Sequence, residues 1–452
     1  MRRTQLKENL SKPRIGVIAD DLTGALDTAA QFVAVGLAAF TILDWSSLES
    51  YREIPVLSVS TESRPLPPVE AAERVRHAAV FFSEAGRYIY KKIDSLLRGN
   101  VAAEVLAVGT NCKALPVVAP SFPAQKRLTL DGEVFVDGRP LSEVLGGGGS
   151  STVGKTLVRI FEEHCAVEIL PLSVVRRGVG EVCAAVEKTS GGVLVADAET
   201  DEDLQVLAKA LLNSPRRVVP CGSAGLAAAL SRELETLPEK GCVRTEFSLQ
   251  AARVFVVAGS QSPVTARQVS ALGKAYSVEP TVISALQLWD DGWDAHARDA
   301  ALDACAKLRD GRLAVLVLSG GNELLARLED PRQVEQAVEL LASRLGAVGA
   351  DIVREVGKCG LVLTGGATAK AVLSEIGVEA LRVVSQVEPG VPLSSSVGGF
   401  AEGSPVVTKA GAFGDDNTLV RAVNLLMGRS AWKARGRWWR LPWVTPTGWG
   451  RK

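Results

Sequence analysis

The stretch at residues 14–36 constrains the fold of this chain more than any other. Its apolar run at 15–19 predicts a buried strand, and the apolar residues at helical spacing behind it predict a helix that ends at a glycine. A second predicted strand follows, so the stretch opens a βαβ unit of a parallel sheet. Asp20, Asp21 and Thr23 then lie between the first strand and the helix, where open α/β sheets bind ligands.

Three more predicted strands in the first half, at 55–60, 87–93 and 114–120, also end in polar residues. Because the carboxyl ends of parallel strands lie at one edge of a sheet, these polar residues are expected around one crevice. They are Asp20, Asp21, Arg64, Lys91, Asp94, Arg98 and Asn100. Two adjacent carboxylates together with Thr23, Gly24 and Asp27 exceed what a helix cap requires, so the crevice is predicted to be functional.

In the second half of the chain, predicted strands are again followed by distinctive residues, but these are glycines rather than charged residues. Predicted strands at 253–258, 312–318 and 359–364 each run into a glycine-containing turn that precedes a helix. Such turns leave backbone N–H groups free to bind phosphate. The sequence therefore predicts an α/β protein of two α/β domains with mostly parallel sheets and an active site in the interdomain cleft.

A chain of 452 residues is long enough for two domains of ordinary size. The segment at 236–250 lacks periodicity and is the predicted linker. It separates an N-terminal domain at 1–236 from a C-terminal domain at 253–428. The tail at 429–452 is rich in tryptophan and arginine without a helical or strand period, so it is expected outside the core.

Composition excludes several classes of protein. The 51 basic and 51 acidic residues balance, so no overall field points to nucleic acid or to an anionic membrane. No apolar run approaches the ~18 residues of a membrane span, and the first residues lack a signal-peptide core. The seven cysteines are scattered and form no Cys-x-x-Cys pair, which is typical of a reducing compartment. A cytoplasmic protein is predicted, and the three histidines lack metal-ligand spacing, so metal-binding residues stay unknown.

Residues 149–156, Gly-Ser-Ser-Thr-Val-Gly-Lys-Thr, match the Walker A pattern of a P-loop NTPase. A P-loop needs a buried strand directly before its first glycine and a helix directly after its lysine. The preceding residues hold Pro140, two charges and a run of four glycines, which is typical of a loop. A P-loop NTPase is therefore kept as an alternative, and Lys155 is predicted to play no part in nucleotide binding.

A series of motifs covers nearly the whole chain up to residue 428 in one order. They include Ala19-Asp-Asp-Leu-Thr-Gly-Ala25, Glu62-Ser-Arg64, Lys92-Ile-Asp-Ser95, Leu97-Arg-Gly-Asn100, Gly222-Ser-Ala-Gly-Leu226, Thr364-Gly-Gly-Ala-Thr368 and Lys409-Ala-Gly-Ala-Phe-Gly414. On these motifs the chain resembles the four-carbon acid sugar kinases, or tetronate kinases. The resemblance implies an N-terminal acid-sugar-binding domain, a C-terminal nucleotide-binding domain, and ATP-dependent phosphorylation of the terminal hydroxyl of threonate, erythronate or 3-oxo-tetronate.

The chemistry of such a kinase assigns roles to the clusters. A carboxylate must accept the proton of the attacking hydroxyl, and Asp21 and Asp94 are the two candidates. Cations and hydrogen-bonding groups must hold the sugar acid, and the predicted set is Asp20, Thr23, Arg64, Lys92, Ser95, Arg98 and Asn100. The resemblance assigns ATP to Ser260, Ser262, Gly365, Gly366, Ala367, Thr368 and Gly411. Magnesium is implied by ATP, since it neutralises the phosphate oxygens.

Several positions depart from the family pattern: Ala367 and Ala369 stand where Glu and Ser are usual in the glycine turn, Leu96 stands where Thr is usual, and Ala410 and Ala412 replace polar residues. A sugar-acid-binding protein that has lost kinase activity is therefore the second alternative. The expected partner is a small-molecule sugar acid, with no nucleic acid and no membrane. The sequence does not determine the oligomeric state, and a homodimer is among the expected forms.

Overall fold

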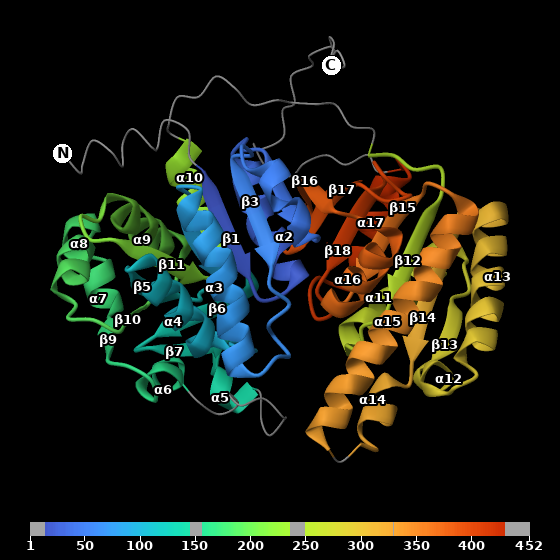
Figure 1. Cartoon of the computed structure of the whole chain (residues 1–452), viewed down its shortest axis with the longest axis horizontal. Coiled ribbons are helices and arrows are strands. Elements are labelled where there is room, and N and C mark those ends of the chain that lie inside the picture. Colours follow the sequence, from blue (N-terminus) through green and yellow to red (C-terminus); the bar gives the residue numbers. More distant parts are fainter. Residues whose placement is uncertain (1–13, 145–155, 236–248, 329, 430–452) are drawn as a thin grey trace, which may run out of the picture.

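The computed structural model of the protein describes residues 14–144, 156–235, 249–328 and 330–429 (Figure 1). Most of the predicted linker, the Walker-type residues up to Lys155 and nearly all of the tryptophan-rich tail lie outside these described residues. The description below is of the remainder.

The N-terminal domain builds parallel strands from the apolar runs predicted for them. These are β1 (Ile15–Ala19), β2 (Ala39–Ile42), β3 (Val56–Ser60), β4 (Tyr88–Lys92), β5 (Leu115–Ala119), β9 (Val167–Leu170), β10 (Val193–Ala196) and β11 (Val218–Gly222). A small antiparallel sheet of β6 (Arg127–Leu130), β7 (Glu133–Val136) and β8 (Arg139–Pro140) holds the predicted hairpin. Most residues of these strands are apolar because helices cover the sheet.

Some helices of this domain begin at a side-chain cap that the sequence supplies. Asp21 caps α2 by accepting a hydrogen bond from Gly24 N at 2.9 Å, and Thr200 and Asp203 form a capping box at α9. The helices are α2 (Leu22–Ala34), α3 (Pro68–Glu84), α4 (Val101–Cys112), α5 (Leu141–Val144), α6 (Leu157–Glu162), α7 (Leu172–Val175), α8 (Val179–Lys188), α9 (Asp201–Asn213) and α10 (Ala224–Glu235). Two 3₁₀ turns, η1 (Trp45–Tyr51) and η2 (Pro123–Gln125), complete it.

The C-terminal domain repeats the parallel α/β plan and adds an antiparallel hairpin. Its strands are β12 (Val254–Ala258), β13 (Thr281–Ser284), β14 (Leu313–Ser319), β15 (Gly360–Thr364), β16 (Ala380–Glu388), β17 (Val391–Val397) and β18 (Pro405–Lys409). Its helices are α11 (Pro263–Tyr276), α12 (Ala285–Trp289), α13 (Trp293–Gly311), α14 (Gly321–Leu325), α15 (Pro331–Val356), α16 (Gly366–Ile376) and α17 (Thr418–Leu426).

The two domains share one sheet. Its strand order is β13-β14-β12-β15-β18-β17-β16-β2-β3-β1-β4-β11-β5-β10-β9, and the junction is the antiparallel pair of β16 with β2, in which Ala380 faces Ile42 and Val383 faces Ala39. The sequence predicted two α/β domains but not this junction, because β16 and β17 were not recognised as strands. Figure 1 shows the two halves side by side with β16 and β17 near the centre.

Strand direction reverses at this junction. Both pairs that β17 makes, with β16 and with β18, are antiparallel, whereas β18, β15, β12, β14 and β13 are mutually parallel. The parallel strands of the two domains therefore run in opposite senses along the shared sheet. In the part of the chain that the structure describes, no helix is long and apolar enough to cross a membrane.

Candidate active site

A pocket lies between the two domains. Its volume with its mouth is about 410 Å³. The N-terminal domain contributes Asp21, Thr23, Gly24, Asp27, Arg64, Lys92, Asp94, Ser95, Arg98, Phe122, Ser223 and Ala224, and the C-terminal domain contributes Gly390, Ala410 and Phe413. The expected crevice therefore exists at the strand ends of the N-terminal domain, and the second domain closes it.

Arg64 is held by two carboxylates. Its Nε and Nη2 donate to the two oxygens of Asp20 at 2.7 and 3.0 Å, and its Nη1 lies 2.9 Å from Asp21 Oδ2. Thr23 Oγ1 also donates to Asp21 Oδ2, at 2.7 Å. Burial alone would raise the pKa of Asp21, but the charges of Arg64 and Lys92 outweigh it and lower that pKa. Asp20 is buried behind Arg64 and does not line the pocket.

Asp94 and Arg98 form a second closed pair, four residues apart in the chain. Asp94 accepts hydrogen bonds from the backbone N, the Nε and the Nη2 of Arg98, at 3.2, 2.6 and 3.0 Å. Burial opposes ionisation of Asp94, but Arg98 and Arg64 hold its pKa well below the usual range. Each of the two carboxylates predicted as a candidate for the base is therefore bound by an arginine.

Lys92 is the cation of the pocket without a hydrogen-bonded partner among the described residues, although its charge acts on Asp21, Asp27 and Asp94. It is 6 % exposed, and among the described residues its Nζ makes no hydrogen bond or ion pair. The ammonium lies so near the start of α2 that a Cβ on Gly24 would be 3.0 Å from it. Burying an unpaired ammonium is costly, so this position is suited to an anionic ligand.

Lys91 does not belong to the crevice, contrary to the sequence prediction. Neighbouring residues of a strand point to opposite faces of the sheet, and the Lys91 side chain is wholly buried on the other face. There its Nζ lies 2.7 Å from Glu104 Oε2. Asn100 is also outside the pocket lining, since its amide donates to the carbonyls of Ser63 and Leu66 and so supports the loop that carries Arg64.

Arg127 and Phe413 join the domains at the pocket. Arg127 Nη1 donates to Ser95 Oγ, and its guanidinium carbon lies 5.2 Å from the centre of the Phe413 ring. This is the geometry of a cation–π contact. Burial lowers the pKa of Arg127.

The predicted nucleotide-binding turns converge in the C-terminal domain. A Cβ on Gly411 would overlap with Ser260 Oγ and lie 3.4 Å from Ser262 Cβ. A Cβ on Gly365 would lie 3.4 Å from Thr368 Oγ1 and 3.5 Å from Ser260 Cβ. Strands β12, β15 and β18 are neighbours in the sheet, so their carboxyl-end turns meet at one place.

Lys409 holds the Gly411 turn in place through hydrogen bonds. Its Nζ donates to the carbonyls of Ala410, Gly411 and Phe413 at 2.8, 2.9 and 3.2 Å. Thr265 Oγ1 donates to the Gly411 carbonyl at 3.0 Å. Burial lowers the pKa of Lys409 to about 8. The carbonyls of this turn are thus occupied by the protein itself.

The two halves of the site meet at the start of α16. A Cβ on Gly366 would lie 3.4 Å from Asp21 Oδ2 and 3.7 Å from Thr23 Oγ1. Ala367 is exposed at the same turn, whereas Ala369 is fully buried in the core. A polar side chain at 369 would therefore face the core rather than a ligand.

Sequence reasoning singled out Asp27 beside the two aspartates without giving it a role, and it gave no role to several other residues that the fold brings to the pocket. These are Gly24, Arg127, Phe122, Ser223, Ala224, Gly390, Ala410 and Phe413. Asp27 carries a recognisable signal, because it is a carboxylate within the apolar helix α2. The residues of the C-terminal domain carry none, since only the shared sheet brings them near Asp21.

The structure does not place the Walker-type segment in the context of a P-loop. Its first glycines lie outside the described residues, and the residues before them form the short helix α5 rather than a strand. Asp197, which directly follows β10, accepts hydrogen bonds from the backbone N of Asp131, Gly132 and Leu172. Its role is to hold loops together.

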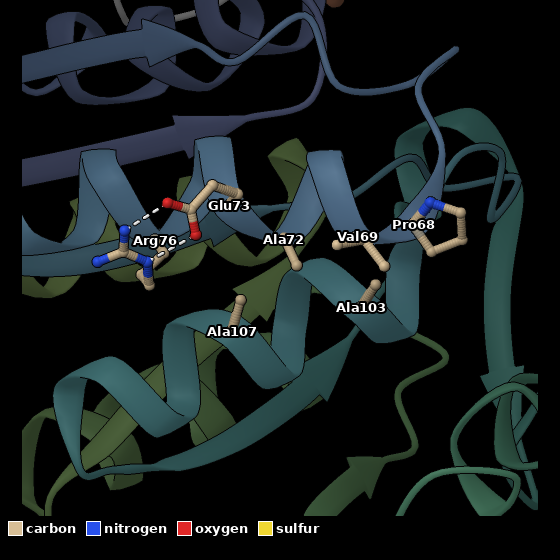
Figure 2. Close-up of a pocket in the computed structure, with 7 residues that line it drawn as sticks. All are labelled: Pro68, Val69, Ala72, Glu73, Arg76, Ala103 and Ala107. Atoms are coloured by element: carbon tan, nitrogen blue, oxygen red, sulfur yellow. Dashed lines mark hydrogen bonds and ion pairs between the residues drawn. The ribbon is translucent and has the colours of Figure 1, made fainter.

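A second hollow, of about 690 Å³ with its mouth, lies on the outer face of the N-terminal domain between α3 and α4 (Figure 2). Figure 2 shows alanines and Val69 along its floor, and its charged pair, Glu73 with Arg76, bonds within the pair. No polar groups converge on it, so the smaller interdomain pocket is the better candidate.

Comparison with known proteins agrees with the division of the chain. Residues 15–230 match the family model of a sugar-binding N-terminal domain, and residues 255–419 match that of a nucleotide-binding C-terminal domain. A crystal structure from Salmonella typhimurium LT2 superposes with a TM-score of 0.71 at 23% identity, covering 90% of this chain and 98% of that chain. Fold and domains together define a two-domain kinase of sugar-like substrates.

The names of curated relatives define the family more closely than the two domain models do. A D-threonate kinase of Salmonella typhimurium is 34% identical and covers 90% of this chain and 97% of its own length. A D-threonate kinase of Bordetella bronchiseptica is 35% identical, with 92% and 98% covered. More distant relatives are a D-erythronate kinase at 27% and a 3-oxo-tetronate kinase at 28%. The chain belongs to the four-carbon acid sugar kinase family.

Proposed function

We propose that the protein transfers the γ-phosphoryl group of ATP to the terminal hydroxyl of a four-carbon sugar acid, and that D-threonate is the first substrate to test. The observation that carries the proposal is the pocket itself. In this pocket the N-terminal domain presents the buried ammonium of Lys92 and groups that can bind hydroxyls. These groups face the glycine turns of the C-terminal domain. The names of the relatives that are about a third identical support D-threonate over erythronate and 3-oxo-tetronate.

The sugar-acid residues divide by what they already bind. Lys92 and the Nη1 of Arg98, which no described residue engages, are proposed to hold the substrate carboxylate. Thr23 and Ser95 offer hydroxyl oxygens to the substrate. Arg64, with Asp20, Asp21 and Asn100 around it, forms the charged wall of the pocket, and Asp94 orients Arg98.

The nucleotide is proposed to bind the C-terminal turns, with phosphates against Ser260, Ser262, the turn 365–368 and Gly411. The close approach of Gly411 to Ser260 leaves room for glycine alone, which suits backbone contact with phosphate. Within the described residues no group of three or more His, Cys, Asp or Glu side chains is placed to hold a metal ion. We therefore assign Mg²⁺ to the nucleotide phosphates, whose charge it neutralises.

The test is ADP release from Mg-ATP with D-threonate, D-erythronate and 3-oxo-tetronate, with calorimetry of each acid in parallel. Turnover with one of the acids is the expected result. An acid that binds without turnover would support the sugar-acid-binding protein instead. Lys155→Ala should retain near-parental turnover, and a collapse of the rate would support the P-loop alternative, whose lysine stabilises the transferred phosphoryl group.

A further inference from the structure

We propose that Asp27 is the general base of the phosphoryl transfer. It would accept the proton of the substrate hydroxyl in the pocket between the domains. This inference rests on the proposed function and adds to it a residue that the sequence motifs did not assign to catalysis.

Three carboxylates line the pocket, and two of them are occupied. Asp21 binds Gly24 N, Thr23 Oγ1 and Arg64, and Asp94 takes three hydrogen bonds from Arg98. Protonation of either carboxylate would remove the negative charge that an arginine stabilises, so neither accepts a proton readily. Asp21 and Asp94 are therefore suited to act as fixed negative charges that orient the arginines bound to them.

Asp27 differs from both. It lines the same pocket and is 6 % exposed, and the hydrogen bond to its side chain comes from Gln31 Nε2 to Oδ1, at 3.3 Å. No described residue donates to its Oδ2, and no described arginine or lysine forms an ion pair with it. One carboxylate oxygen therefore remains available to a substrate hydroxyl.

The position of Asp27 also suits transfer between the domains. It lies on α2, which packs against β16 and β17 of the C-terminal domain. The pocket that Asp27 lines is closed by Gly390, Ala410 and Phe413, next to the turn proposed to hold phosphate. A hydroxyl bound at Asp27 would thus face the nucleotide domain.

The charges around Asp27 come from several elements. Lys92 and Tyr90 lie on β4, Asp21 caps α2, and Arg127 lies on β6. Burial raises the pKa of Asp27 to about 6, although Lys92, Gln31 and Arg127 oppose the rise. Burial also raises the pKa of Tyr90, so Tyr90 stays neutral. A carboxylate of this basicity is ionised at neutral pH and takes up a proton more readily than an ordinary aspartate.

The step balances as follows. The hydroxyl O–H bond breaks and its proton moves to Asp27 Oδ2, while the hydroxyl oxygen forms a bond to the γ-phosphorus. The bond from the γ-phosphorus to the bridging oxygen breaks, and its electron pair leaves with ADP. The proton on Asp27 passes to solvent when the pocket opens to release the products.

The first experiment compares Asp27→Asn, Asp21→Asn and Asp94→Asn by kcat and by calorimetry of both ligands. Asn keeps the shape of Asp but is a very poor proton acceptor, so Asp27→Asn should lower kcat by about 10²–10⁴-fold. Its Kd values for D-threonate and ATP should stay within about threefold of the parent, which a merely structural role does not predict. The proposal is overturned if Asp27→Asn keeps kcat within about threefold of the parent.

The second experiment is a pH profile of kcat/KM. The parent should lose activity below about pH 6 as Asp27 is protonated. Gln31→Leu removes the hydrogen bond that lowers this pKa, so the acidic limb should move to higher pH while Asp27 is retained. If the acidic limb of the Gln31→Leu profile stays at the same pH as in the parent, Asp27 is not the general base. This test does not use Asp27→Asn, so it remains valid even if that variant fails to fold.

The two proposals can fail separately. A parent that turns over no tetronate overturns the proposed function and the role of Asp27 together. An active parent with an active Asp27→Asn variant overturns the role of Asp27 alone.

Discussion

Adjacent lysines on β4 have different roles because their side chains point to opposite faces of one strand. Lys91 is paired with Glu104 in the core, whereas Lys92 is unpaired in the pocket. Sequence reasoning could predict that charge gathers at the end of this strand. The strand pattern alone placed Lys91 at the crevice, although Lys92 was the lysine assigned to the substrate, because the pattern does not show which side of the sheet Glu104 occupies.

The lysine pair gives a matched test. Lys92→Met should weaken D-threonate binding about 10–100-fold, the range expected for a charged hydrogen bond, with little loss of stability. Lys91→Met should leave D-threonate binding near the parent but lower the free energy of unfolding by about 3–5 kcal/mol, because Glu104 is left buried and unpaired. Calorimetry and urea unfolding of both variants measure the two effects, and equal affinities in both variants would refute the assignment of Lys92.

Asp27 should also affect the pH dependence of stability. Its pKa in the folded state is raised from 3.8 to about 6. The folded state therefore binds this proton more tightly than the unfolded state. That contribution to stability is fully present below the unfolded pKa and is lost as pH rises through about 6.

Asp27→Asn removes this titration. Urea unfolding should show the variant gaining stability relative to the parent by about 3 kcal/mol between about pH 3.5 and pH 7.5, a figure that follows from about two pKa units. A difference between variant and parent that is constant across this range would show that the Asp27 pKa is ordinary in the folded state. A gain in stability together with a loss of kcat is the pattern expected of a catalytic group.

At the scale of single elements, sequence reasoning succeeded where a strand is an uninterrupted apolar run, as in β12, whose residues are all buried. It failed for β16 and β17. The buried serines of β17, Ser394 to Ser396, do not show the apolar pattern of a covered strand. Gly390, which has a φ of 82°, marks the turn of this hairpin, but a single glycine does not reveal a strand pair.

The glycine turn after β18 can be tested by itself. Gly411→Ala places a methyl group on Ser260 Oγ, so the turn must move away from the other phosphate-binding turns. ATP affinity should fall at least tenfold, and D-threonate affinity should change little. The double variant Gly411→Ala with Ser260→Gly removes the overlap and should recover part of the ATP affinity relative to Gly411→Ala alone. If Gly411→Ala binds ATP like the parent, the nucleotide does not use this turn.

At the scale of the whole molecule, the domains are joined by more than a linker. Besides the β2–β16 pair, the backbone N of Leu43 and of Asp44 donate to the Glu379 carbonyl at 2.8 and 3.0 Å, and Lys370 Nζ donates to the Leu43 carbonyl at 3.0 Å. Sequence reasoning predicted two domains and their ligands, but these contacts join residues more than 300 positions apart in the chain. Spacing along a single sequence does not reveal such contacts.

We therefore expect the domains to unfold together. Scanning calorimetry should show one transition, and a non-hydrolysable ATP analogue should move the whole transition upward, because a ligand of either domain stabilises the shared sheet. The variant Leu381→Pro is a control in which the pairing of β16 with β2 is disrupted, because proline is poorly tolerated within a strand. It should separate the transition into two. Two transitions in the parent, with one alone moved by the analogue, would contradict this expectation.

The reversal of strand direction at β2 and β16 means that a flat sheet could not form this active site. In a flat sheet, the carboxyl ends of β1 and β15 would lie at opposite edges, with Asp21 and Gly366 far apart. Six strand intervals separate β1 from β15, and each adds roughly 20–25° of right-handed twist, or roughly 120–150° in all. That rotation turns the two edges toward each other until Gly366 meets Asp21. On the proposed assignment of the two ligands, the number of strands between the domains sets how the nucleotide-binding turns face Asp21.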